Sequence, residues 1–490
     1  MPVAELAAAA SSTWTIPYLL IADWVIRITM AIVVLLRRRS EPSVSLAWLV
    51  LVVSIPIVGT IIYLLVGETR LGRSRVARHA EIVARVERPE VRLPHSPAAR
   101  AHKLGVHEEQ LALLAESVGG NVPLAGNRLE LFGDTDVVIQ RLVEDIDAAQ
   151  EHCHMLFYIY LDDDSGRRVG EALARAAMRG VKARLLVDDV GSRDFLRSPL
   201  RRQIAAEGVA VAGALPASLP RMLLQRIDLR NHRKIAVIDG RIGWTGSQNI
   251  ANAEFAPKAH YAPWVDCMVR IQGPVVHDLQ TLFVEDWFLD SSESVEAVLR
   301  HVPDPLDHGC TAQFLGTGPG SSRAAMRLLI QAMVQLAREE LVLTTPYFVP
   351  DEATLLTLCA TARRGVKVHL VVPRRNDSRL VALASRGFYE PLLDSGVEIR
   401  EFNGGLLHAK TLVVDRHICL ISSANLDRRS FELNFETGLV VYDDDFSSQL
   451  RFLQTGYMES STRVDPSRWR DRSWPARLAQ NAAGLMGPLL

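Results

Sequence analysis

The sequence has little of several features that mark common protein classes. Only five of its 490 residues are cysteine and none of them has C-x-x-C spacing, so neither a disulfide framework nor a zinc ribbon is indicated. The 55 Lys and Arg residues against 56 Asp and Glu residues leave a net charge of -1, which argues against a broadly basic nucleic-acid-binding surface. Low-complexity stretches are few and 23% of residues are charged, which excludes disorder over most of the chain. A chain of this length is expected to form two or more domains.

What the sequence has in excess is apolar character, and most of it lies near the start. Residues 44–67 read VSLAWLVLVVSIPIVGTIIYLLVG and hold no charged side chain. At about 1.5 Å per residue, one helix over this stretch crosses a hydrocarbon core of about 30 Å. Pro56 and Gly59 are tolerated in such a helix. The stretch predicts a transmembrane helix, with a buried soluble helix as the alternative.

A second apolar stretch, residues 14–36, is interrupted by Asp23 and Arg27. These two side chains are four residues apart, so on a helix they share a face and can pair, which lowers the cost of placing them in a membrane. An interfacial or tilted helix is the alternative. No basic segment precedes the stretch, so a cleavable signal peptide is not expected. Together the two stretches predict a two-helix transmembrane hairpin.

The charges beside the predicted spans only weakly indicate which side of the membrane holds the rest of the chain. Arginines 37–39 lie between the two predicted spans, and four more arginines follow the second span by residue 78. Under the positive-inside rule, either the segment between the spans or the segment after them could therefore be cytoplasmic. A cytoplasmic position for the bulk of the chain is slightly favoured.

From about Asn127 onward, runs of strand length alternate with helical patterns, and one arrangement occurs twice. The strand-like runs 155–161 and 341–349 are each followed by a helical segment, and both helices lead into the next strand through the words Arg-Gly-Val-Lys, at 179–182 and 364–367. The glycine is expected to end each helix. Ordered matches at similar offsets indicate an internal repeat. We expect an α/β protein with two mixed-sheet halves related by pseudo-twofold symmetry and a site at their junction.

Each half carries the polar pattern H-x-K-x4-D-x6-[GS]-S-x-N. The first copy supplies His232, Lys234, Asp239, Ser247 and Asn249, and the second supplies His408, Lys410, Asp415, Ser423 and Asn425. The His, Lys and Asp residues are predicted to form the catalytic set. Strand alternation puts each His and its Lys on one face but each Asp on the other, where it would support a turn.

Two histidines, two lysines and several hydroxyl and amide donors at one point suit a phosphate diester. The lysines and the Ser and Asn side chains would bind the non-bridging oxygens, as substrate phosphate ligands. One neutral histidine can attack phosphorus while the other, protonated, protonates the leaving alkoxide. This chemistry needs neither a metal nor a cofactor, and His152-Cys153-His154 has no evident second ligand cluster, so no metal site is expected.

The paired motif resembles the phospholipase D superfamily, whose signature it is. Further segments are similar to the bacterial cardiolipin synthases of that superfamily: TPYFVPDE at 345–352, SANLDRRSFELNFE at 423–436, DDVGS at 188–192 and the two amino-terminal apolar stretches. The resemblance covers essentially the whole chain. One departure is Ser422, where many members have glycine.

The resemblance implies roles for the paired residues. It makes His232 the nucleophile and His408 the acid and then the base. It also implies that a downstream carboxylate orients each histidine and stabilises its cationic form. On this basis Asp266 is expected to orient His232 and Glu436 to orient His408, with surface ion pairs as the alternative.

The reaction that the resemblance implies is phosphatidyl transfer from one phosphatidylglycerol to another, giving cardiolipin and glycerol. Water in place of the second lipid would give phosphatidic acid. The expected partners are phosphatidylglycerol, cardiolipin and the bilayer of a bacterial inner membrane, with no nucleic acid; a homo-oligomer is compatible with the sequence. The alternative functions are a phospholipase D-type phosphodiesterase, which would be a lipid hydrolase or, less favoured, a nuclease, and a non-catalytic membrane scaffold, which two complete motifs disfavour.

The expected organisation has five parts. These are a membrane hairpin at 1–67, a juxtamembrane linker at 68–126, a first repeat at 127–305, a second repeat at 306–464 and an amphipathic tail at 465–490. Trp469 and Trp474 lie among arginines and apolar residues in that tail, which suits a membrane-surface helix, although an ordinary docked helix is the alternative. The segment 219–224 is expected either to dip into the lipid interface or to form a buried helix.

Overall fold

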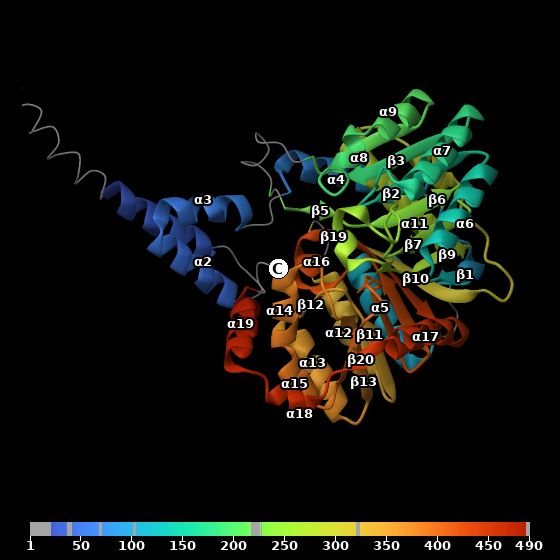
Figure 1. Cartoon of the computed structure of the whole chain (residues 1–490). Coiled ribbons are helices and arrows are strands. Elements are labelled where there is room, and N and C mark those ends of the chain that lie inside the picture. The colour runs from blue at the N-terminus through green and yellow to red at the C-terminus, as the bar shows by residue number, and fades with distance from the viewer. Residues whose placement is uncertain are drawn as a thin grey trace, which may run out of the picture. The chain divides into compact units, whose positions relative to one another are not determined.

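The computed structural model describes residues 21–36, 42–67, 71–100, 104–216, 226, 228–319 and 324–486. The chain forms two compact units, residues 1–72 with 217–228, and residues 73–216 with 229–490 (Figure 1). The predicted interfacial segment 219–224 lies outside the described residues.

The first unit is helical but differs from the predicted hairpin. Residues 21–36 form a helix, in which Arg27 Nε donates to Asp23 Oδ2 at 2.8 Å, so the predicted pair is confirmed. The stretch predicted as one helix over 44–67 is instead two helices, α2 (Pro42–Ser54) and α3 (Pro56–Val66). The break falls at Ile55, because Pro56 disfavours the helical conformation of the residue before it. Among the described residues no helix is both long and apolar enough to cross a membrane.

The second unit is built on one large mixed sheet, which confirms the predicted α/β class. One side of it has the order β4 (Ala210–Ala214), β3 (Lys182–Asp188), β2 (His152–Phe157), β6 (Lys234–Ile238), β7 (Ile242–Gly246), β9 (Met268–Gln272) and β1 (Leu124–Phe132). The order continues through β10 (Cys310–Thr317), β19 (Asn434–Tyr442), β17 (Ile418–Ser422), β16 (Thr411–Val414), β11 (Glu340–Thr344), β13 (Lys367–Pro373), β14 (Glu398–Phe402) and β20 (Ser461–Arg463). Strands β2, β3 and β4 are parallel neighbours, as are β11, β13 and β14.

Helices pack on this sheet and on one another. They are α4 (Arg73–Val86), α5 (Val106–Gly119), α6 (Thr135–Ala148), α7 (Asp164–Met178), α8 (Arg193–Arg197), α9 (Pro199–Ala206), α11 (Val276–Ser291), α12 (Ala325–Leu336), α13 (Glu352–Arg363), α14 (Arg379–Gly387), α15 (Tyr389–Asp394), α16 (Arg428–Glu432), α17 (Asp444–Glu459), α18 (Pro466–Arg470) and α19 (Trp474–Leu485). Gly180 and Gly365, which follow α7 and α13, have φ of 94° and 95°. A side chain rarely adopts this conformation, so the repeated glycine ends both helices as expected.

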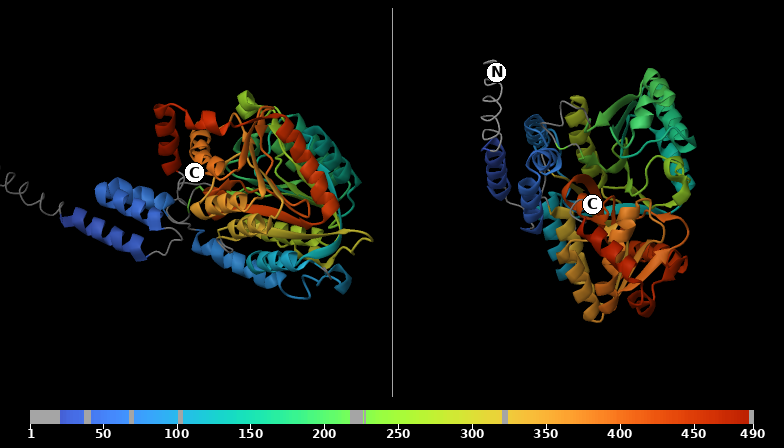
Figure 2. Two further views of the ribbon diagram at one scale, coloured as in Figure 1. Left: turned by 90° about the horizontal axis from the view of Figure 1, so that it is seen from below. Right: turned by 60° about the vertical axis from the view of Figure 1, so that its left-hand side comes forward.

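The two sides of the sheet share one core. A single buried cluster contains Val237 and Ile271 from the first side and Val413 and Leu439 from the second. The antiparallel pairing of β1 with β10 joins the two sides, with Leu124 opposite Ala312. The green side and the orange and red side lie against each other in the views of Figures 1 and 2. The chain therefore holds both copies of the motif in one unit.

Candidate active site

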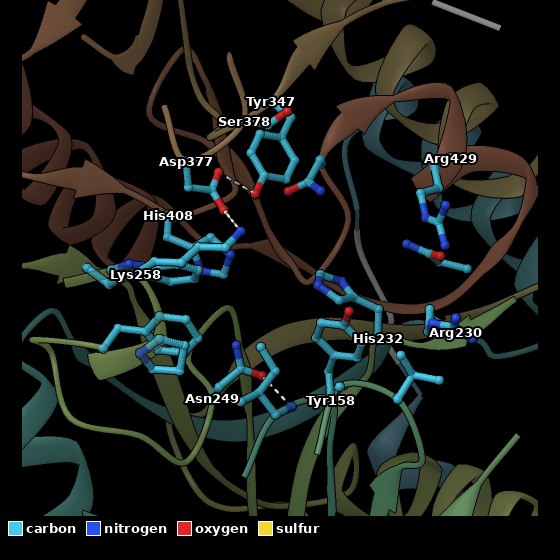
Figure 3. A pocket seen from close by; sticks show the side chains of 18 of the residues that line it. Tyr158, Arg230, His232, Asn249, Lys258, Tyr347, Asp377, Ser378, His408 and Arg429 are labelled. Carbon is cyan, nitrogen blue, oxygen red and sulfur yellow. Dashed lines mark hydrogen bonds and ion pairs between the residues drawn. The ribbon is translucent and has the colours of Figure 1, made fainter. Parts of the chain in front are cut away.

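A cavity of about 630 Å³ collects side chains from both sides of the sheet (Figure 3). His232 and Asn249 line it from the first motif, and His408 and Asn425 line it from the second. The two copies of the motif thus meet at one cavity.

Two short strands cross from one half to the other and place the histidines. Strand β5 (Arg230–Asn231) pairs in parallel with the start of β19, so that His232 follows alongside Glu436, and the backbone N–H of His232 donates to Phe435 at 2.9 Å. Strand β15 (Leu406–Leu407) pairs in parallel with β8 (Trp264–Val265), so that His408 follows alongside Asp266. Backbone pairing therefore sets each histidine beside a carboxylate of the opposite half.

His232 is held by Glu436. Its Nδ1 lies 2.9 Å from Oε2 of Glu436, whose side chain is fully buried. Ser423 Oγ donates to the same carboxylate oxygen. Burial opposes the charge on Glu436, but His232 and Lys234 keep the pKa of this carboxyl below its usual value, so it is ionised. Burial lowers the pKa of His232 to about 4, so its ring is neutral near pH 7.

His408 is held in the same way by Asp266. Its Nδ1 lies 2.7 Å from Oδ1 of Asp266, and Ser247 Oγ donates to that oxygen at 2.5 Å. Burial opposes the charge on Asp266, but His408 and Lys410 bring the pKa of this carboxyl to about 2. Burial lowers the pKa of His408 as well. A carboxylate at Nδ1 fixes the proton there on both rings, which leaves each Nε2 with a lone pair.

The predicted partner of each histidine is wrong. Glu436 was expected at His408 and Asp266 at His232, whereas Glu436 contacts His232 and Asp266 contacts His408. The expectation kept each pair within one repeat. The exchange arises because β5 and β15 each pair with a strand of the other half.

The two lysines hold the backbone of the histidines. Lys234 Nζ donates to the carbonyl oxygen of His232 at 2.6 Å, and Lys410 Nζ does the same to His408 at 2.6 Å. Burial lowers the pKa of Lys234 to about 7 and that of Lys410 to about 8. Each lysine therefore fixes the chain at its histidine and brings a titratable positive charge close to the ring.

The two aspartates of the motif are not at the cavity, which corrects their place in the predicted catalytic set. The Asp239 carboxylate accepts from the backbone N–H groups of residues 150, 151 and 152 at 2.7–2.9 Å. The Asp415 carboxylate accepts from those of residues 338, 339 and 340, each at 2.8 Å. Both cap the entry to a strand, as strand alternation had indicated for a supporting residue.

The hydroxyl and amide donors of the motif divide into two groups. Ser247 and Ser423 bond to the carboxylates that hold the histidines, which corrects their predicted role as phosphate ligands. Asn249 and Asn425 line the cavity. The Asn249 Oδ1 accepts from the N–H of Ile159 at 3.0 Å, an arrangement that leaves its amide nitrogen for the cavity.

Comparisons with known proteins agree with this geometry. A family model described as a cardiolipin synthase, phospholipase D-like domain matches residues 142–287 and 330–452. Cardiolipin synthase A of Edwardsiella ictaluri (strain 93-146) is 36% identical over 471 residues, which cover 95% of this chain and 97% of that protein. Cardiolipin synthase A of Erwinia tasmaniensis is 38% identical over 482 residues, with the same coverage. The chain belongs to the phospholipase D-like cardiolipin synthase family.

Two further matches concern the start of the chain and its fold. Residues 27–68 match a family model described as a phospholipase D-nuclease N-terminal region. The solved phosphatidylserine synthase of Haemophilus influenzae Rd KW20 has a TM-score of 0.60 at 15% identity and covers 78% of this chain and 100% of its own. At that identity the likeness concerns the fold alone.

In this cardiolipin synthase family member the cavity also holds side chains that the motif did not indicate. Tyr158 lies edge-on to the ring of His232, with centroids 4.7 Å apart, and Trp264 lies 4.6 Å from that of His408. Figure 3 shows Arg230 and Arg429 at the His232 end. Arg429 lies in the segment 423–436 that already resembled the family, and Trp264 lies two residues before the predicted Asp266, whereas Tyr158 had only its place within the predicted strand 155–161 as a signal.

The opposite end of the cavity carries an ion pair. Asp377 contacts Lys258 at 2.5 Å and accepts from the hydroxyl of Tyr347 at 2.7 Å. Figure 3 shows this group beside His408. The cavity is therefore polar at both ends, with a histidine at each.

One group among the described residues could hold a metal ion. His95, His277 and Asp278 place one ligand atom each within 4.8 Å of the others, and Arg92 already pairs with Asp278 at 2.7 Å. These residues do not line the cavity. His152 and His154, which the sequence did not mark as a metal site, are bridged by the side chain of Gln280 at 2.9 and 2.8 Å.

Proposed function

We propose that the chain is a cardiolipin synthase that transfers a phosphatidyl group from one phosphatidylglycerol to another through an intermediate on His232. The observation that carries the proposal is one cavity with two histidines, each held at Nδ1 by an ionised carboxylate. Two such rings supply a nucleophile and an acid for a phosphate diester.

In the first step, Nε2 of His232 attacks the phosphorus of phosphatidylglycerol. The P–O bond to the head-group glycerol breaks, and protonated His408 gives its Nε2 proton to the departing alkoxide. Glycerol leaves, and phosphatidyl-His232 remains. The bound phosphate raises the pKa of His408 and favours the protonated form that this step needs. Glu436 stabilises the positive charge that develops on His232.

In the second step, His408 takes the proton from a terminal hydroxyl of a second phosphatidylglycerol. The oxygen attacks phosphorus, the P–N bond to His232 breaks, and cardiolipin forms. Asn249 and Asn425 are the proposed ligands of the non-bridging oxygens. Arg230 and Arg429 add positive charge at the His232 end, where the phosphate must lie for attack.

Water in place of the second lipid would release phosphatidic acid, the reaction of a phospholipase D-type hydrolase. A synthase must therefore hold a second lipid close and keep water out. The aromatic rings of Tyr158 and Trp264 against the two histidines support exclusion of water. The residues described for this chemistry need no metal or other cofactor.

We propose that the chain is duplicated and anchored in a bacterial inner membrane. Outward from the centre, the order β1, β9, β7, β6, β2, β3, β4 corresponds to β10, β19, β17, β16, β11, β13, β14. Asp239 and Asp415 make equivalent contacts in their two halves, and so do Lys234 and Lys410, which supports the duplication.

The apolar helices of the first unit support a membrane anchor in the form of a multi-pass hairpin. The proposal also includes a cytoplasmic position for the catalytic unit and a homo-oligomer.

Incubation of the purified full chain with phosphatidylglycerol in detergent tests the activity. We expect glycerol and cardiolipin in equal amounts, and no product from the His232→Ala variant. Phosphatidic acid as the sole lipid product would overturn the synthase and favour the hydrolase. DNA cleavage in buffer without divalent metals would favour the nuclease.

A further inference from the structure

The last helix of the chain turns an apolar stripe outward. Trp474, Leu478 and Leu485 of α19 are 75%, 61% and 84% exposed. They are four and seven residues apart, so they lie on one face of the helix. The opposite face is covered, because Gln480 and Ala483 are buried. A stripe of neighbouring exposed apolar side chains is typical of a contact surface.

Helix α19 packs on α14, and α14 forms part of the cavity wall. Ala483 belongs to a buried cluster with Ala384 of α14, and Val381 of α14 packs against that cluster. Val381 and Ser378 at the start of α14 also line the cavity. Figure 1 shows the two helices side by side. The apolar stripe is therefore connected to the active site through a single helix.

Exposed arginines lie on α19 and around the start of α14. Arg375, Arg379 and Arg477 are exposed, and no carboxylate among the described residues pairs with them. Arginine side chains that flank apolar residues place their charge at the level of lipid head groups. The proposed substrate is an anionic lipid, so the charge of this face and that of its bilayer are complementary.

We propose that the outer face of α14 and α19 is the surface by which the catalytic unit rests on an anionic bilayer. Trp474, Leu478 and Leu485 enter the interface, and the three arginines contact lipid phosphates. Lipid then reaches His232 and His408 from the side of the cavity that α14 forms. This inference rests on the proposed lipid substrate and adds the surface through which the substrate arrives.

Site-directed labelling of the full chain in phosphatidylglycerol-containing nanodiscs tests the contact. A fluorophore on Leu478→Cys is compared with one on Phe452→Cys, because Phe452 is 81% exposed on α17, which lies apart from α14 (Figure 1). Four of the native cysteines are buried, and burial raises the pKa of the fifth, Cys310, to about 12, so labelling favours the new thiol. Lipid-borne quenchers should quench position 478 several-fold more than 452. Equal quenching at the two positions would overturn the proposal.

Activity separates this proposal from the proposed reaction. Combined Trp474→Ser, Leu478→Ser and Leu485→Ser changes should lower cardiolipin formation in bilayers about tenfold and leave turnover of monomeric short-chain phosphatidylglycerol unchanged. Phe452→Ser should change neither rate. Equal loss on both substrates, or a change of oligomeric state in the triple variant, would show that the stripe serves folding or another copy of the chain. A wild-type protein inactive on both substrates would refute the reaction, while the quenching result would still decide the docking surface.

Discussion

His232 and Glu436 are 204 residues apart in the sequence, yet Nδ1 of His232 lies 2.9 Å from Oε2 of Glu436. In the reciprocal pair, Nδ1 of His408 from the second half lies 2.7 Å from Oδ1 of Asp266 from the first half. Each half of the protein therefore supplies the histidine for one role and the carboxylate for the other. Neither half alone contains a histidine together with the carboxylate that holds it.

The crossed pairs predict which variant regains activity when the substrate has a better leaving group. A phosphatidyl ester of 4-nitrophenol needs no proton on its leaving oxygen, so the first step no longer requires His408. Asp266→Asn disturbs His408 and should release nitrophenol at a rate close to that of the unchanged protein. Glu436→Gln disturbs the nucleophile His232 and should lose about 10²–10⁴-fold on this ester.

The measurement is the first turnover of nitrophenol release, followed by absorbance. On phosphatidylglycerol itself both variants should be impaired, which is the control. Rescue of Glu436→Gln and not of Asp266→Asn would restore the pairing within each half and refute the crossed arrangement.

The sequence identified most residues of the motif but not which of them contact one another. The repeated His, Lys, Ser and Asn spacing identified the motif residues, and strand alternation separated Asp239 from His232, because both signals are local. The exchange of β5 and β15 between the halves is non-local and leaves no periodic pattern. Ser247 and Ser423 bond to carboxylates of their own half, 19 and 13 residues further along the chain, and the motif spacing gave no signal for these contacts. The division of the 44–67 stretch at Ile55 did have a local signal, which was Pro56.

The low pKa of His232 predicts how the first step depends on pH. Burial lowers this pKa from its usual value near 6.5 to about 4, so the neutral nucleophile persists as the pH falls from 7 to 5.5. Over the same range the protonated fraction of His408 increases. The kcat/KM for glycerol release should therefore hold or rise. A loss of about tenfold with a midpoint near 6.5 would show that His232 titrates normally.

Asp239 and Asp415 are predicted to affect stability rather than chemistry. Each carboxylate accepts three backbone N–H groups at the entry to a strand, so Asp239→Ala or Asp415→Ala leaves these donors without their side-chain partner. We expect each change to reduce the free energy of unfolding by about 1–3 kcal/mol. Thermal denaturation in detergent measures this, and KM at low temperature should remain unchanged. A full loss of activity in a variant of unchanged melting temperature would return these residues to the catalytic set.

Asn249 is predicted to bind the substrate phosphate through its amide nitrogen. Asn249→Asp keeps an oxygen for the N–H of Ile159 but sets a negative charge against the phosphate. KM should rise about 10–100-fold with little change in melting temperature. Ser247→Ala is the matched control, because it acts through Asp266 and should lower kcat instead. An unchanged KM in Asn249→Asp would remove this residue from the phosphate site.

The assignment of the nucleophile is the central claim, and trapping the intermediate tests it most directly. The Asp266→Asn variant retains both histidines but has a weakened base for the second step, so the intermediate should accumulate on the nitrophenyl ester. Peptide mass spectrometry of the quenched protein should place the phosphatidyl group on the peptide that contains His232. A phosphatidyl group on His408, or release of nitrophenol with no adduct on either histidine, would contradict the mechanism.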